Sequence, residues 1–135
     1  MSRALLATAL AAALPALATD ISVEIAGVES SKGHVLVALY DEETFLKKKP
    51  VQKLRIDLAP GTAVTGVFRD VPEGTYAVVA FHDENGNGKL DRNLIGIPTE
   101  KIGFSNNPSL WGPPRFSDSK FVLGSAAQRF AITLR

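Results

Sequence analysis

Apolar and polar residues alternate along much of the chain, which is the pattern of strands that bury one face in a core. The first clear example follows Asp20, where Ile21, Val23 and Ile25 occupy every second position. Gly27 then interrupts the alternation and leads into a polar segment. The pattern predicts a half-buried β-strand that ends near Gly27.

The same rules predict further strands along the rest of the chain. The complete set of expected strands covers residues 20–26, 34–40, 54–58, 64–71, 75–82, 120–124 and 128–134. Residues 34–40 are apolar on both faces, which favours a central position in a sheet. Short turns lead us to expect that 64–71 and 75–82 form one antiparallel hairpin and that the last two strands form another. About seven short strands of this kind indicate an all-β fold, a single antiparallel β-sandwich.

Residues 92–119 form a long stretch with little strand character. A connection of this length in a small domain is usually either functional or disordered. Disorder is disfavoured because the stretch is rich in large apolar side chains, namely Ile95, Ile97, Ile102, Phe104, Leu110, Trp111 and Phe116. We expect an ordered loop that packs across one end of the sandwich.

Oxygen-bearing side chains recur at every second position directly after the strand at 75–82. The run Asp83-Glu-Asn-Gly-Asn-Gly-Lys-Leu-Asp91 matches the front of a calcium-binding loop. In such loops alternate side chains point at one centre, and a glycine at the sixth position makes the sharp turn. The expected ligands are Asp83, Asn85, Asn87, the backbone carbonyl of Lys89, and Asp91.

The last part of the calcium pattern is absent, because Leu94 stands where a bidentate glutamate usually closes the site. We expect Glu100 to supply the missing acid, with Asn93 and Asp41 as further candidates. Two carboxylates among the loop ligands predict weak binding, with a dissociation constant of about 10⁻⁴–10⁻³ M. The alternative is a metal-free turn, because two successive Asn-Gly pairs also favour tight turns.

The start of the chain predicts export. Arg3, an alanine and leucine run, and Ala16-Leu17-Ala18 are typical of a secretory signal peptide, here residues 1–18 with cleavage after Ala18. The run is too short for a permanent membrane span. We therefore expect one domain over residues 19–135, in the periplasm or secreted.

Charge and cysteine content exclude several function classes. Without Arg3, the 15 basic residues become 14, against 14 acidic residues. A neutral mature chain has no general attraction for nucleic acid or an anionic membrane. The chain has no cysteine, which excludes disulfides and thiolate metal sites.

Four motifs in order resemble a family of bacterial exported proteins grouped as domain of unknown function 2141. These motifs are His82 to Asp91, Gly96-Ile-Pro98, Gly103-Phe-Ser-Asn-Asn107 and Gly112-Pro-Pro-Arg-Phe116. The resemblance covers essentially all of the mature chain and implies a secreted or periplasmic β-sandwich without an established activity. The segment Val71 to Tyr76 is also similar, at the level of fold, to transthyretin-like and collagen-adhesin repeat domains. Neither resemblance supplies catalytic residues.

We expect a non-enzymatic module that binds calcium rather than an enzyme. The chain has two histidines and neither a Gly-x-Ser-x-Gly elbow nor a His-Glu-x-x-His pair. A hydrolase that uses His82, with Ser105 or Ser117 near it in space, is one alternative. The competing interpretation is that His82 is a hydrogen-bonded residue at a strand end, and we expect His34 to be solvated.

A carbohydrate- or peptide-binding module is the other alternative. Trp111, Phe104 and Phe116 would then form an aromatic platform for a sugar ring or an extended peptide. The competing interpretation is that these rings form the small core of their own loop. Exposure of Trp111 beside other rings would favour the platform.

Overall fold

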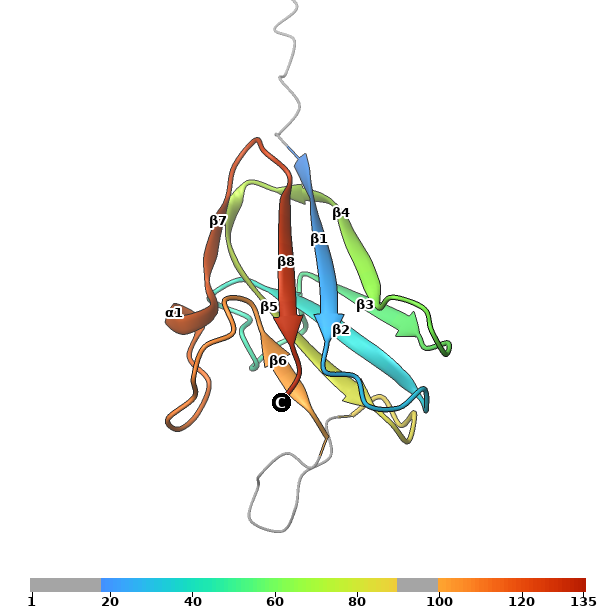
Figure 1. Cartoon of the computed structure of the whole chain (residues 1–135). Coiled ribbons are helices and arrows are strands. Elements are labelled where there is room, and N and C mark those ends of the chain that lie inside the picture. Colours follow the sequence, from blue (N-terminus) through green and yellow to red (C-terminus); the bar gives the residue numbers. More distant parts are fainter. Residues whose placement is uncertain (1–17, 90–99) are drawn as a thin grey trace, which may run out of the picture.

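Two β-sheets pack face to face in the computed structural model, which describes residues 18–89 and 100–135 (Figure 1). The described residues form eight strands and one short helix, α1 (Phe116–Ser119). The expected all-β sandwich is therefore confirmed. Within residues 92–119, the sequence analysis missed α1 and one short strand, β6 (Ile102–Phe104).

The smaller sheet has three strands in the order β4-β1-β8. These strands are β1 (Ala18–Ala26), β4 (Thr65–Pro72) and β8 (Gln128–Thr133). Strand β1 is antiparallel to β4 and parallel to β8. Its alternating residues Ile21, Val23 and Ile25 are all buried, as the periodicity predicts.

The larger sheet has five strands in the order β3-β2-β5-β6, and β7 pairs with the beginning of β5. The remaining bounds are β2 (His34–Tyr40), β3 (Gln52–Asp57), β5 (Gly74–Asp83) and β7 (Phe121–Leu123). Strand β2 lies inside the sheet, between β3 and β5, as its two apolar faces predict.

Both expected hairpins are wrong. Strands β4 and β5 are adjacent in sequence, but β4 pairs with β1 and β5 pairs with β2. Likewise β7 pairs with β5, whereas β8 pairs with β1. The turn after β4 crosses between the sheets, and the Tyr76 hydroxyl stabilises this corner by donating a hydrogen bond to the Pro72 carbonyl at 2.8 Å. A short connection shows that two strands are close in space. It does not show whether they pair within one sheet or lie in opposite sheets, because both sheets of a sandwich are within reach of such a corner.

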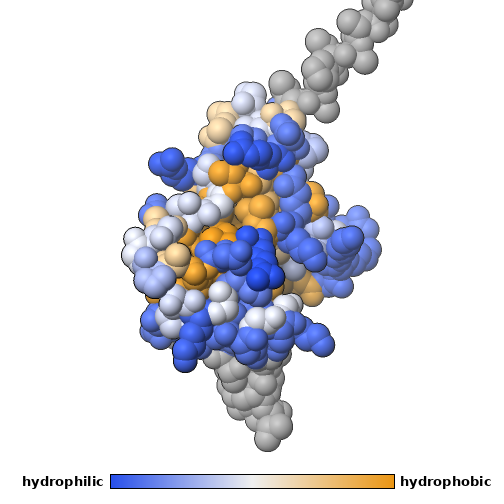
Figure 2. Space-filling view, turned by 90° about the vertical axis from the view of Figure 1, so that its right-hand side faces the viewer, coloured by the Kyte–Doolittle hydropathy of each residue, from blue (hydrophilic) through white to orange (hydrophobic). Residues whose placement is uncertain are grey.

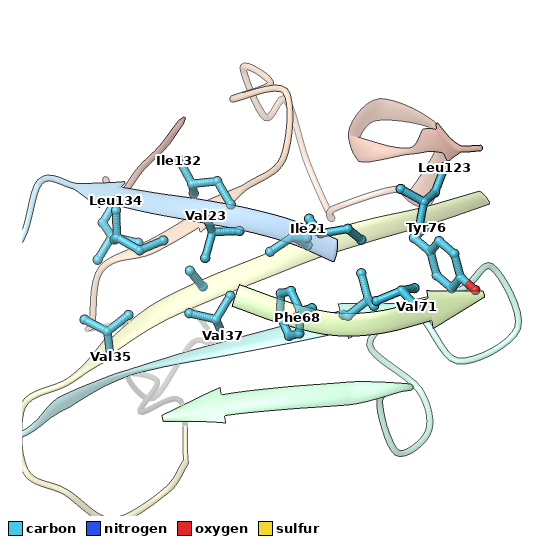
Figure 3. Packing of buried hydrophobic residues seen from close by; sticks show 14 residues of the cluster. Ile21, Val23, Val35, Val37, Phe68, Val71, Tyr76, Leu123, Ile132 and Leu134 are labelled. Atoms are coloured by element: carbon cyan, nitrogen blue, oxygen red, sulfur yellow. The ribbon is translucent and has the colours of Figure 1, made fainter. Parts of the chain in front are cut away.

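Side chains from both sheets meet in one core (Figure 3). Phe68 of β4 and Leu39 of β2 are among its fully buried members. A second, smaller cluster lies on the outer face of the larger sheet and includes Phe45, Val79 and Phe104. The larger sheet is thus apolar on parts of both faces.

The edge strands β3 and β4 lie on the same side of the molecule, the side that Figure 2 shows. Apolar side chains form a band through the middle of this side, with hydrophilic residues around them. Leu54 and Ile56 of β3 lie over Gly66 of β4, where any larger side chain would meet them. Lys53 and Arg55 are exposed on β3, and charged residues of this kind protect an edge strand from pairing with another chain.

Candidate functional site

The expected metal loop leaves the larger sheet at the end of β5. Asp83 is the last residue of β5 and lies opposite His34, the first residue of β2. The loop therefore begins where the two inner strands of this sheet meet the same end of the sandwich (Figure 1).

The carboxylate of Asp83 organises the loop. Its side chain is 0% exposed. Oδ2 accepts a hydrogen bond from the Gly88 N–H at 2.6 Å, and Oδ1 accepts one from the Asn87 N–H at 3.2 Å. Oδ2 also lies 3.1 Å from Nε2 of His34. Because one buried side chain holds two backbone groups, it closes the loop on itself.

The two asparagines continue this arrangement. Oδ1 of Asn85 accepts a hydrogen bond from the Asn87 N–H at 3.2 Å, and Oδ1 of Asn87 accepts one from the Lys89 N–H at 2.9 Å. Gly86 and Gly88 both have positive φ, +69° and +75°, which lets the backbone curl between the oxygens. The structure thus brings Asp83, Asn85, Asn87 and Lys89 into one compact turn.

Some expected ligands lie outside the described residues, namely Asp91 and Asn93, as does Leu94. Among the residues that the structure describes, no group of three or more histidine, aspartate or glutamate side chains is placed to hold a metal ion. The described loop side chains supply the carboxylate oxygens of Asp83 and the amide oxygens of Asn85 and Asn87, and all of them accept hydrogen bonds from backbone N–H groups of the loop itself.

Glu100 reaches the loop, but Asp41 does not. Oε2 of Glu100 accepts a hydrogen bond from the Glu84 N–H at 2.9 Å, so this acid lies beside the first turn of the loop. Asp41 follows Tyr40 at the far end of β2, about 20 Å from His34 at roughly 3.3 Å per residue. Asp41 is therefore too distant to be a ligand.

The expectation that His34 is solvated is wrong, because the residue is 5% exposed. Strand register places it directly against Asp83. The preceding residue, Gly33, has φ +67° and lies so close to the chain at residues 83 and 84 that a Cβ would overlap the Asp83 carbonyl oxygen. Gly33 therefore lets the turn before β2 pack against the loop.

His82 and Ser105 both have structural partners. His82 is buried, and its Nε2 lies 2.7 Å from the carbonyl oxygen of Lys32. Ser105 is also buried and donates a hydrogen bond to the Ser119 carbonyl at 2.5 Å. Among the described residues no hydrogen bond joins the two, and Ser117 is exposed. The geometry gives both side chains a role in holding the backbone.

The three aromatic rings expected in a platform are not together. Trp111 is 96% exposed. Phe104 is buried in the outer-face cluster, and Phe116 packs on the same cluster with its ring 5.7 Å from that of Phe45. Phe104 and Phe116 therefore belong to a small core, and Trp111 alone is presented to solvent.

Comparison with known proteins shows the family. Residues 23–131 match the family described as "Uncharacterized protein conserved in bacteria (DUF2141)". The chain belongs to this family. The resemblance inferred from the four motifs is therefore confirmed, and the DUF2141 match includes the loop that starts at Asp83.

Solved structures show a weak similarity in fold to the DUF2141 chain. Chains described as a pilus-presented adhesin, Spy0125 (Cpa), are 10% identical with TM-scores of 0.38 and 0.36, and a Cys426Ala mutant of that adhesin is 11% identical with a TM-score of 0.31. These matches cover 87–90% of this chain but only 27–28% of the adhesin chains. No curated protein matches the DUF2141 chain.

The match to a bacterial family is compatible with the expected export of this chain to the periplasm or the exterior. The family is described as bacterial. Among the described residues, no helix is long and apolar enough to cross a membrane. The expected signal peptide at residues 1–18 lies outside the described residues, except for Ala18, which lies opposite Pro72 at the start of β1.

Proposed function

We propose that this chain is an exported, non-enzymatic β-sandwich module that binds calcium at the loop beginning at Asp83. The observation that supports the proposal most directly is the buried Asp83 carboxylate, which draws the Asn87 and Gly88 N–H groups around itself. A carboxylate offers about four acceptor sites, so it can hold a cation as well as these donors. Glu100, which contacts the Glu84 N–H, would add a second carboxylate from beyond the loop.

The role of the ion would be structural. Calcium takes roughly six to eight oxygen ligands, so it would gather oxygens from the loop and from Glu100 at one centre. The bound ion would then connect the end of β5 to the segment that enters β6. We therefore propose that calcium stabilises this end of the sandwich.

Calcium is expected to raise the melting temperature of the purified protein. At ten times the dissociation constant, binding adds about 1.4 kcal/mol of stability, which corresponds to roughly 5 °C in a domain of this size. The measurement is a thermal melt followed by circular dichroism in 10 mM calcium, in 10 mM magnesium and in chelator. A concentration of 10 mM is at least about ten times the expected dissociation constant. Identical melts in calcium and chelator would exclude the site.

A pair of matched variants locates the effect. Asn87→Ala removes a loop oxygen and is expected to abolish most of the calcium-induced shift. Asn106→Ala removes the same amide from a turn in which the side chain donates to the Lys120 carbonyl. It is expected to lower the melting temperature but to keep the full calcium shift. Loss of the shift in both variants would place the ion elsewhere.

A second candidate function rests on Trp111, which is 96% exposed. A fully exposed tryptophan can anchor a sugar ring or a peptide. If Trp111 has this role, its fluorescence will change on titration with bacterial glycans or peptides, and Trp111→Ala will lose binding without a change in melting temperature. Unchanged fluorescence across both ligand classes would remove this candidate.

A further inference from the structure

The outer face of the larger sheet carries a groove of about 800 Å³, which is within the usual range for small-molecule sites. Its floor comes from β2 and β5, where Leu36 lies opposite Phe81 and Ala38 lies opposite Val79. Neighbouring residues on these strands point the other way, into the core between the sheets. The groove therefore has a hydrocarbon floor on a face that is open to solvent.

A preformed turn closes one end of this groove. The Asp41 carboxylate accepts hydrogen bonds from the hydroxyl and the N–H of Thr44, at 2.8 and 2.9 Å, and these bonds hold the pKa of Asp41 below its ordinary value. Phe45 then enters the outer-face cluster, with its ring 5.9 Å from that of Tyr40. The turn is fixed at both points, so the wall that it forms does not depend on a ligand.

Leu46 is the residue that this turn presents to the groove. It is 45% exposed and lines the groove, although the neighbouring Phe45 is buried. Its φ is +54°, a left-handed conformation that bulky residues rarely adopt. Backbone strain of this kind gathers at ligand sites, because the surrounding structure holds a side chain where the ligand needs it.

The charges around the groove are of one sign. Lys47, Lys48, Lys53 and Arg55 line it, and no aspartate or glutamate is among the described residues that do so. Lys48 and Arg55 pair with acidic residues that do not line the groove, whereas Lys47 and Lys53 have no ion pair with any described residue. An apolar floor beside unpaired ammonium groups is complementary to a ligand with a hydrocarbon chain and an anionic head.

We propose that this groove binds a fatty acid. The acyl chain lies along the floor formed by Leu36, Ala38, Val79 and Phe81. The carboxylate lies at the end where Lys47 and Lys53 are found, because Lys53 is opposite Ala38 and Lys47 belongs to the turn after β2.

Other occupants fit less well. An extended peptide would need backbone partners, but β2 is already hydrogen-bonded to β3 on one side and to β5 on the other. The backbone N–H and C=O groups of the bound peptide would then have no hydrogen-bond partners over an apolar floor, which is unfavourable. A second copy of this chain, placed symmetrically, would bring two sets of lysines face to face. An acyl chain has neither problem.

Titration calorimetry with dodecanoate below its micelle concentration tests the proposal. The titration is done in chelator, so its result does not depend on an ion bound at the loop, although Gly86, Asn87 and Gly88 of that loop also line the groove. We expect one dodecanoate per chain, and affinity that falls by up to about fourfold for each methylene removed from the chain. Dodecyltrimethylammonium, which has the same chain with the opposite charge, is expected to bind at least about tenfold more weakly.

Three variants assign the site. Lys53→Glu is expected to weaken dodecanoate binding by about tenfold. Arg129→Glu makes the same charge change at an exposed position on β8, in the other sheet, and is expected to leave binding unchanged. Leu46→Asn keeps a residue that tolerates the left-handed conformation but removes the apolar wall, so binding should weaken without a loss of melting temperature.

Several results would overturn the proposal. One is the absence of dodecanoate binding, and another is an equal loss in the Lys53 and Arg129 variants. Equal binding of the cationic amphiphile would show nonspecific adsorption. Binding of an acidic helical peptide in place of dodecanoate would assign the groove to a protein partner.

Discussion

Replacement of Asp83 by alanine is expected to destabilise the protein by about 3–5 kcal/mol, because several contacts to one buried carboxylate are lost together and hydrogen bonds to a charged group contribute about 1.5–3 kcal/mol each. The carboxylate is fully buried and contacts the Asn87 and Gly88 N–H groups and the His34 ring. Alanine would leave the Gly88 N–H and the His34 ring without this acceptor, and the Asn87 N–H would keep its bond to Oδ1 of Asn85 at 3.2 Å. His34 is buried, so the loss of its partner costs about 1–3 kcal/mol. Asn87 and Gly88 are exposed, so water replaces part of their lost hydrogen bonding.

Urea denaturation in the presence of chelator measures this effect apart from any bound ion. Asp57→Ala is the matched control, because Asp57 lies opposite His34 on the other side, in β3. Its side chain is exposed and, among the residues that the structure describes, forms an ion pair with Arg55 at 3.1 Å. The control should change stability by less than about 1 kcal/mol. Equal losses in the two variants would mean that burial of Asp83 is not what stabilises the loop.

Substitution of Gly33 by alanine is expected to cost about 2–5 kcal/mol. The left-handed conformation accounts for about 1–2 kcal/mol of this loss. The collision of the new Cβ with the backbone at residues 83 and 84 adds about 1–3 kcal/mol. The backbone there cannot move away easily, because the Asp83 side chain and the pairing of β2 with β5 both hold it.

Gly61→Ala separates these two contributions. Gly61 has φ +73°, and a Cβ added there would have nothing within 4 Å, so this variant carries the conformational cost without the collision. We expect about 1–2 kcal/mol for this control. Urea midpoints of the two variants give the comparison, and similar losses would show that the contact between residue 33 and the loop contributes little.

Local pattern in the sequence was sufficient to predict most of the strands. The alternation of Ile21, Val23 and Ile25 and the apolar segment 34–40 correspond to β1 and β2. Strand β6 was missed because it has only three residues, Ile102–Phe104, and includes Gly103. Pairing was missed because periodicity reports which face is buried and carries no information on which sheet a strand joins.

The sequence predicted one part of the candidate site and missed others. The spacing of oxygens after residue 82 indicated the loop, and Glu100 does lie beside it. The place of His34 against Asp83 follows from the register of β2 and β5, which no local pattern contains. The groove on the outer face also escaped notice, because its floor and its cationic rim come from segments that are separate in sequence.

The parallel pairing of β1 with β8 affects the time at which the protein can finish folding. Ile21 lies opposite Gln128, so the first described strand of the sandwich pairs with the last described one. Contacts between residues so far apart in sequence slow folding. A chain in which β8 has not yet paired keeps one edge of β1 open, and it therefore stays accessible to chaperones until this pairing forms.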